Sequence, residues 1–143
     1  MYAKITNGVV EQFPYTLGNL RRDNPNTSFP KEIPSETLAA YGVVEVTITP
    51  MPAIDGRTHT QNRSVQFIDG VWTQVWTPEQ LGEQEAGANI RADRNSRLAQ
   101  SDWTQGKDIP EATSTAWATY RQALRDIPTQ AGFPYNVTWP QEP

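Results

Sequence analysis

The sequence predicts an α+β fold, with a small antiparallel β-hairpin-rich N-terminal domain followed by a C-terminal αα-hairpin and an extended, Pro-rich tail. Asn7-Gly8 and Asp69-Gly70 each lie between apolar residues of strand-like pattern, and both dipeptides tolerate the positive φ angles of a tight hairpin turn. After Thr77 the apolar spacing changes to that of an amphipathic helix. The predicted domains are therefore residues 1–76 and 77–143.

The remainder of the first domain is expected to be irregular chain, a short helix and a strand. Prolines recur through Pro14–Pro34 and exclude a long helix or a central strand, so we expect a loop with one short turn. Ser35 is a good N-cap for a short helix, which Gly42 ends. The β-branched residues of Val43–Thr49 then predict a strand.

The first helix of the second domain is predicted from a capping box. Thr77 and Gln80 have the spacing of such a box, with Pro78 at the first helical position. Gly82 and Gly87 each cost about 1 kcal/mol relative to Ala in a helix interior. The stable part of this helix is therefore expected from about residue 88 to residue 100.

A second helix is expected to follow a second box-like start at Asp108–Glu111 and to end at Pro128. Its apolar residues recur at helical spacing and are expected to face the first helix. They are Ala116, Trp117, Tyr120, Leu124 and Ile127. The last stretch is too rich in Pro for regular structure, and Phe133, Val137 and Trp139 are expected to anchor it.

Composition and charge exclude several classes of protein. The chain has 12 Lys and Arg against 16 Asp and Glu, a net charge of −4, which argues against general binding of nucleic acid. It has no Cys, hence no disulfide framework and no thiolate metal site. No apolar run approaches the length of a membrane span, and the N-terminus lacks the apolar region of a signal peptide. We expect a cytoplasmic protein that binds neither membrane nor nucleic acid.

The sequence offers little with which to catalyse a reaction. His59 is the single histidine, and it is expected to be a solvated loop residue. Nucleophile-elbow and phosphate-loop motifs are absent, and no acidic run has the spacing of a calcium loop. We therefore predict no enzyme activity, no catalytic or metal-binding residues and no cofactor.

Aromatic and basic residues are the candidates for contacts with another protein. Trp103, in a predicted loop, and Trp76, at a strand end, favour a protein-facing surface, where Trp is enriched; Trp117 is expected in the core. Two interpretations stay open for the Arg91, Arg94 and Arg97 series: a basic stripe for an acidic partner or RNA, or a solvated helix face with Asp93 interleaved. Arg121 has the same alternatives, or it clamps the preceding turn. The candidate partner-binding residues are Trp76, Trp103, Arg94, Arg97, Tyr120, Arg121, Phe133 and Trp139.

The C-terminal sequence resembles the C-terminal domain of phage tail assembly chaperones, also called tail-fibre assembly proteins. The pattern begins with a helix spaced R-x-x-R-x-x-x-L that leads into S-D-W-T-Q at Ser101–Gln105. It continues with W-x-x-Y-R-Q-x-L-R-D-I-P at Trp117–Pro128 and closes with G-F-P at Gly132–Pro134 and a final W-P at Trp139-Pro140. The run P-Y-x-L-x-x-L-R-x-D-N-P, followed by S-F-P, in Pro14–Pro30 is similar to the leader of many such phage proteins.

This resemblance implies a chaperone in the cytoplasm of an infected bacterium. It would bind a tail-fibre or other tail protein stoichiometrically and assist its folding, trimerisation or attachment. Two alternatives stay open: a permanent part of the virion tail, such as an adaptor at the fibre or baseplate, and a carbohydrate-binding module.

Overall fold

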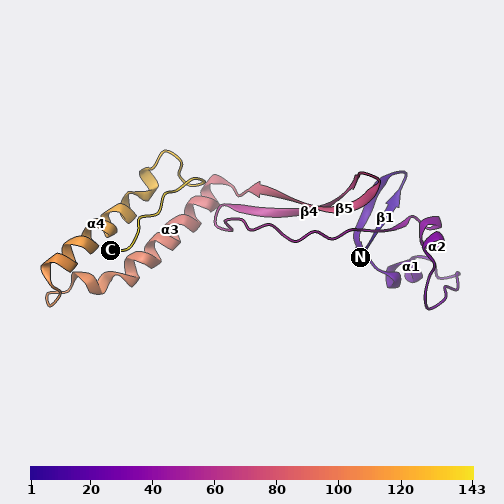
Figure 1. The fold of residues 1–143 in the computed structure, drawn as a ribbon, viewed down its shortest axis with the longest axis horizontal. Helices are drawn as coiled ribbons and strands as arrows, with labels where there is room; N and C mark the ends of the chain where they lie inside the picture. Colours follow the sequence, from indigo (N-terminus) through magenta and orange to yellow (C-terminus); the bar gives the residue numbers. More distant parts are fainter. The chain divides into compact units, whose positions relative to one another are not determined.

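The computed structural model describes residues 1–143 and confirms the α+β class, with antiparallel β-structure preceding the long helices (Figure 1). The elements in chain order are β1 (Tyr2–Thr6), β2 (Val9–Tyr15), α1 (Leu17–Asp23), α2 (Ser35–Ala40), β3 (Val43–Glu45), β4 (His59–Ile68), β5 (Val71–Gln80), α3 (Glu83–Gln100), η1 (Asp102–Gln105), α4 (Glu111–Asp126) and η2 (Ile127–Thr129). They form two compact units. The first comprises residues 1–53 and 61–77, and the second comprises residues 54–60 and 78–143.

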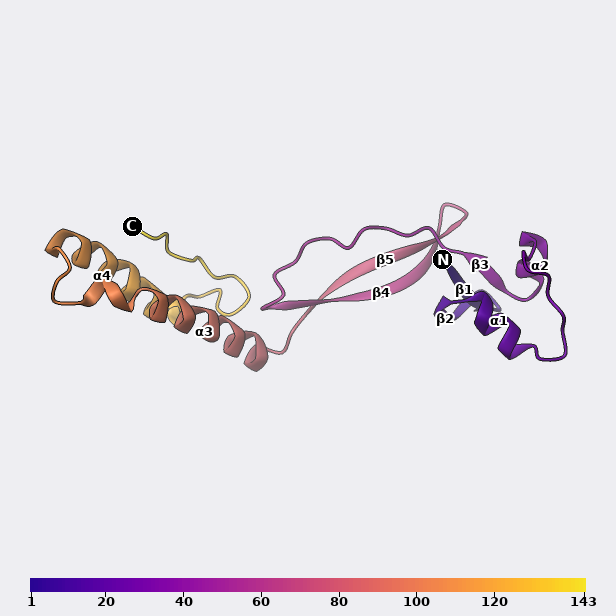
Figure 2. The same cartoon turned by 90° about the horizontal axis from the view of Figure 1, so that it is seen from below.

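The first unit contains a three-stranded antiparallel sheet in the order β2–β1–β3 (Figure 2). The predicted turn between β1 and β2 is confirmed, because Asn7 and Gly8 have φ angles of 52° and 78°. The backbone of β1 is paired on both sides, and β2 and β3 are the outer strands.

Both faces of this sheet are covered by apolar side chains. On one face, Tyr15 and Val43 pack with Leu20 of α1 and Leu38 of α2. On the other face, Ala3, Val44 and Val46 pack with Val65 and Trp72 of the β4–β5 hairpin. Neighbouring residues of a strand point to opposite faces. Short strands therefore serve two thin cores in this unit.

The segment predicted as a loop after β2 contains a true helix, α1. Thr16 caps it, since the Oγ1 of Thr16 accepts a hydrogen bond of 3.0 Å from the backbone N–H of Asn19. Tyr15, at the end of β2, donates a hydrogen bond of 2.8 Å to Asp23 at the end of this helix. Burial, together with that hydrogen bond, raises the pKa of Tyr15 to about 12. These contacts give α1 the stability that its short sequence does not predict.

Two further predictions for this unit need correction. The cap of α2 is Pro34 and makes no side-chain hydrogen bond, so Ser35 is the first residue of the helix and not its cap. The strand predicted over Val43–Thr49 is regular only as far as Glu45, because Thr47 leaves the sheet and forms a bridge with Thr73 of β5.

The β4–β5 hairpin confirms the second predicted turn, with Asp69 at φ 50° and Gly70 at φ 81°. The capping box predicted at Thr77 is wrong, because β5 continues through Gln80. A long-range contact favours the extended form, since the N–H of Leu81 donates a hydrogen bond of 2.9 Å to the carbonyl of Thr58. In a two-stranded ribbon the missing N–H of Pro78 is tolerated on an outer side.

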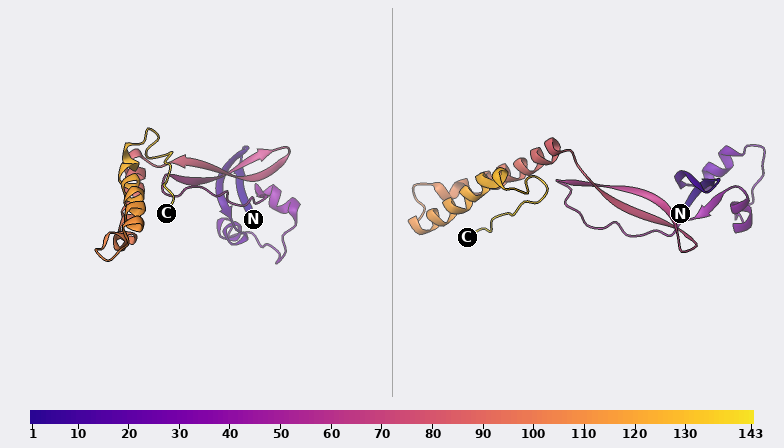
Figure 3. Two further views of the ribbon diagram at one scale, coloured as in Figure 1. Left: turned by 60° about the vertical axis from the view of Figure 1, so that its left-hand side comes forward. Right: turned by 90° about the horizontal axis from the view of Figure 1, so that it is seen from above.

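The core of the second unit is formed by Ile90 of α3, Tyr120 and Leu124 of α4, and Ile127 of η2. The tail turns back along these helices, as Figures 1 and 3 show for the yellow segment. Gly87 does not break α3, which begins at Glu83. A Cβ at Gly87 would lie 3.4 Å from the ring of Phe133 and 3.1 Å from Arg91. Tertiary packing thus compensates for the low helix propensity of this glycine. The predicted second box does not form either, because Pro110 precedes α4 without a side-chain cap.

Substitution of Gly42 by Ala tests how tightly the first unit is built. Gly42 has a φ of 69°, and its new Cβ would overlap the carbonyl oxygen of Ile5. We expect Gly42→Ala to lower the free energy of unfolding of this unit by about 3 kcal/mol or more, because strain and overlap add. Urea unfolding, followed by the amide NMR signals of this unit, measures the loss.

The matched control is Gly70→Ala. Gly70 has a φ of 81°, but nothing lies within 4 Å of the added Cβ. Its cost should be that of the left-handed backbone alone, about 1–2 kcal/mol. Equal losses for the two variants would contradict the packing around Gly42.

Candidate functional site

The connection between α3 and α4 is held by a buried arginine. Arg121 of α4 is 8% exposed, and its guanidinium donates hydrogen bonds of 2.5 Å to the carbonyl of Leu98 and 2.7 Å to the Oγ of Ser101. It also forms an ion pair of 2.7 Å with Asp102, the first residue of η1. A planar guanidinium with several donors suits such a turn, because it satisfies helix-terminal carbonyls and an acid together. We call Arg121, Leu98, Ser101 and Asp102 the turn clamp.

The turn clamp positions Trp103, whose side chain is directed to solvent. Trp103 is 60% exposed, the largest exposure of any aromatic residue of the second unit. Its ring lies 5.8 Å from that of Trp117, which in turn meets the ring of Tyr120 edge-on at 5.4 Å. The three rings run from the surface to the core. We call Trp103 and the half-buried Trp117 the Trp103 face.

The tail is fixed by a different arrangement, in which two arginines contact Trp139. The guanidinium carbons of Arg97 and Arg57 lie 4.3 Å and 5.1 Å from the centre of the Trp139 ring. Asp93 forms ion pairs with both arginines, at 3.0 Å to Arg97. We call Arg57, Asp93, Arg97 and Trp139 the tail clamp.

The charges of the tail clamp stabilise one another. Burial alone would raise the pKa of Asp93, but the hydrogen bonds from Arg97 and Arg57 outweigh it, and the pKa is lowered. The hydrogen bonds from Arg57 likewise lower the pKa of Asp55, against a smaller effect of burial. The pKa of Arg97 is raised, mainly by its hydrogen bond with Asp93. The side chains of Arg57, Asp93 and Arg97 are therefore all charged near neutral pH.

Further contacts hold the first part of the tail. Phe133 covers Gly87 of α3, and the guanidinium carbon of Arg91 lies 4.9 Å from the centre of the Phe133 ring. The hydroxyl of Tyr135 donates a hydrogen bond of 2.7 Å to the carbonyl of Leu81. The side chain of Gln130 binds both the N–H and the carbonyl of Thr138. Arginines and aromatic rings here do the packing that aliphatic residues do in larger cores.

The structure separates the predicted partner-binding residues into distinct places. Tyr120 and Arg121 are buried and are removed from the surface candidates, because the core and the turn clamp occupy their side chains. Arg97, Phe133 and Trp139 come together around the tail, where they contact the chain itself. Of the alternatives for Arg121, clamping of the preceding turn is the one that the structure contains.

Two other candidates lie apart from these residues. Trp76 of β5 is half-buried in the first unit, and its indole N–H donates a hydrogen bond of 3.1 Å to the carbonyl of Thr49. Arg94 contacts its neighbour Asn95. Among the predicted residues, Trp103 thus has the most exposed aromatic surface, and its ring packs against that of Trp117.

His59 is not the solvated loop residue that was predicted. It is the half-buried first residue of β4. Its Nδ1 lies 2.8 Å from the Oγ1 of Thr58, and its ring meets that of Tyr135 at 6.2 Å. No group of three or more His, Cys, Asp or Glu side chains is arranged to hold a metal ion. None of the helices combines the length and the apolar character needed to span a membrane.

The comparison with protein families identifies the helical region. Residues 87–143 match the family model described as phage tail assembly chaperone protein. The resemblance predicted for the C-terminal sequence is thereby confirmed. The matched region includes the turn clamp, the Trp103 face and the tail, whereas Arg57 and the β-structure lie outside it. Neither a curated protein nor a solved structure matches the chain.

Sequence reasoning missed Arg57, which links residues 54–60 to the region that matches the family. Asp93 lies 36 positions further along the chain, and no local pattern pairs the two side chains. The one local signal for an ion-paired Arg57 is Asp55, two residues earlier, which forms an ion pair with it. The tail of the matched region thus contacts a residue outside the matched sequence.

Acid should loosen the contacts that hold the tail of the second unit. The pKa of Asp93 is lowered on folding, so its stabilisation is present above the unfolded value of about 3.9 and is lost as pH falls through the lowered folded value. We expect the indole NMR signal of Trp139 to move toward that of an exposed Trp as pH drops below about 4.

The matched variants are Asp93→Asn and Asp108→Asn. Asp93→Asn removes both ion pairs and should displace the Trp139 signal already at neutral pH. Asp108 is an exposed acid of the same unit, so Asp108→Asn should leave the wild-type profile unchanged. An unchanged profile in Asp93→Asn would contradict the role of Asp93 in the tail clamp.

Proposed function

We propose that this protein is a phage tail assembly chaperone that binds a tail-fibre or other tail protein stoichiometrically and assists its folding, trimerisation or attachment. The observation that carries the proposal is the family match over residues 87–143, a region whose exposed Trp103 is held on a rigid support. The chain acts by contact area and not by turnover, as expected for a chaperone without a phosphate-binding loop.

The Trp103 face has the properties of a binding hot spot. Trp is enriched in hot spots because its large ring gains much on desolvation. Arg121 and Trp117 fix the backbone and the ring on which Trp103 rests. A preorganised side chain loses little conformational entropy when a partner covers it. Binding at this face therefore needs no rearrangement of α3 and α4.

A tail protein is a suitable client on physical grounds. Trimeric β-rich fibres form by slow, non-local strand pairing, which leaves apolar surface and strand edges exposed during folding. Such edges favour aggregation until they are paired. A small protein that binds them temporarily in a one-to-one complex would raise the yield of folded fibre without consuming ATP.

Alanine substitution of the two stacked tryptophans should separate binding from stability. Trp103→Ala should reduce the amount of tail protein that co-purifies with the chain and change the melting temperature little, because Trp103 is largely exposed. Trp117→Ala should cost about 2–3 kcal/mol of stability, since Trp117 packs against the core. The measurements are co-expression with each tail gene of the phage, affinity purification and thermal unfolding.

The control is Met51→Ala, because Met51 is 64% exposed but lies in the first unit. It should change neither quantity. Undiminished co-purification of every bound tail protein with Trp103→Ala would contradict the assignment of the Trp103 face.

Quantitative mass spectrometry of purified virions distinguishes a chaperone from a permanent tail component. A chaperone should be absent from virions or present well below the copy number of its client. Equal copy numbers of the chain and a fibre or baseplate protein would replace this proposal by that of an adaptor. Specific glycan binding that depends on Trp103 would favour a carbohydrate-binding module instead.

A further inference from the structure

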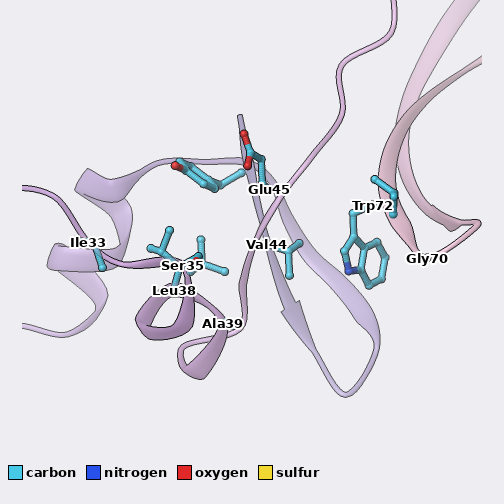
Figure 4. Close-up of a pocket in the computed structure, with 11 residues that line it drawn as sticks. Ile33, Ser35, Leu38, Ala39, Val44, Glu45, Gly70 and Trp72 are labelled. Atoms are coloured by element: carbon cyan, nitrogen blue, oxygen red, sulfur yellow. The ribbon is translucent and has the colours of Figure 1, made fainter.

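A groove in the first unit lies outside the region that matches the chaperone family. It has a volume of about 410 Å³ and is bounded by α2, β3 and the turn of the β4–β5 hairpin. Figure 4 shows Val44 of β3 with Ser35, Leu38 and Ala39 on one side and Gly70 and Trp72 on the other. We call this groove the edge groove.

The edge groove follows the free edge of a β-sheet. β3 is an outer strand, paired only with β1 along its length. The carbonyl of Gly42 accepts a hydrogen bond from the N–H of Ile5 in β1, and the N–H of Val46 donates one to the carbonyl of Met1, directly before β1. Because this pairing alternates along an antiparallel strand, the backbone groups of Val43 and Glu45 face away from β1. An edge of this kind presents donors and acceptors to another extended chain.

The walls of the edge groove belong to both faces of the sheet. Val43 packs in the core beneath α2, whereas Val44 packs in the core beneath the hairpin, and both line the groove. Neighbouring residues of a strand point to opposite faces of the sheet, so both can line one groove only if the groove extends around the edge of the strand. One flank therefore consists of Leu38 and its neighbours in α2, and the other of Val71 and Trp72.

We infer that the edge groove binds an extended segment of another protein, which adds a fourth strand to the sheet beside β3. Main-chain hydrogen bonds to Val43 and Glu45 would hold this segment, as in other cases of strand addition to a sheet edge. Its side chains alternate between the two flanks. Because both flanks are apolar, the segment carries apolar residues at consecutive positions, in contrast to the alternating pattern of a half-exposed strand.

The charge and the length of the edge groove limit which segments can bind there. Glu45 is the one charged residue that lines the edge groove, and it is exposed, so a basic residue of the segment belongs beside it. The free edge is short, because Thr47 leaves β3 and bonds to β5 through Trp72 and Gln74. The groove therefore accepts a core of about three residues, which at 3.3 Å per residue span about 10 Å.

A bare strand fits this site better than a second copy of the chain. In another copy of the chain, α2 and the hairpin turn flank the β3 edge on its two sides. They would clash with α2 and the hairpin turn of the first copy before the two edges could pair. The exposed apolar side chain of Val71, 49% exposed, lies at the rim, where it would be covered by the incoming segment. The inference does not depend on the chaperone proposal, since it rests on the first unit alone.

Peptide binding to the full chain tests the inference. The probe is an acetylated, amidated peptide with a Val-Ile-Val core and a Lys at each end, titrated while the amide NMR signals of the chain are recorded. We expect saturable binding that shifts the amide signals of Val43 and Glu45 and the indole signal of Trp72. The same peptide with N-methylated core amides should bind at least about tenfold more weakly, because it lacks the main-chain donors.

Two matched variants assign the site. Val71→Glu introduces a charge at the rim of the groove and should weaken binding by at least about tenfold. Val9→Glu makes the same change at a residue that is 65% exposed in β2, away from the groove, and should leave the affinity unchanged.

Three results would overturn the inference. They are the absence of saturable binding, equal affinity of the N-methylated peptide, and equal losses in the two variants. If the amides of Val43 and Glu45 instead shift with the concentration of the chain alone, the groove is an interface between copies, which is also incompatible with the segment inferred here.

Discussion

The buried guanidinium of Arg121 is the interaction on which the second unit depends. It joins the end of α3 to the start of η1 from within α4, so that one side chain fixes three consecutive elements. The cost of burying the charge is offset because the carbonyl of Leu98, the hydroxyl of Ser101 and the carboxylate of Asp102 all accept hydrogen bonds from it. The exposed position of Trp103 follows from this arrangement. The aromatic surface proposed for binding is thus a consequence of a polar anchor and not of a large core.

Polar and aromatic contacts also stabilise the tail, where few aliphatic residues are available for packing. Trp139 lies against Arg57 and Arg97, and Phe133 lies against Arg91 over a glycine. In the first unit, short strands serve an apolar layer on each face of the sheet. Thin cores leave edges and walls uncovered, and the edge groove at β3 is one of them. We propose contacts with other chains at two of these features, the Trp103 face and the edge groove.

The sequence predicts those parts of the structure whose causes are local. Asn7-Gly8, Asp69-Gly70 and Gly42 have the expected positive φ angles because each turn depends on the residue itself. The capping box at Thr77 fails because pairing with a segment far away in the sequence extends β5. Helix α3 continues through Gly87 because Phe133 packs on this glycine. Of the candidate site, the exposure of Trp103 was predictable from its loop-like context, whereas the contacts of Arg57 and the edge groove depend on tertiary structure that no local pattern records.

We propose that a tail protein binds the aromatic surface around Trp103. Hydroxyl-radical footprinting of the chain, free and in complex with its co-purified tail protein, measures the solvent accessibility of that ring directly. We expect the oxidation of Trp103 to fall strongly in the complex and that of the half-buried Trp76 to change little. Oxidation of Trp103 at the same rate in the complex as in the free chain would contradict binding at this surface.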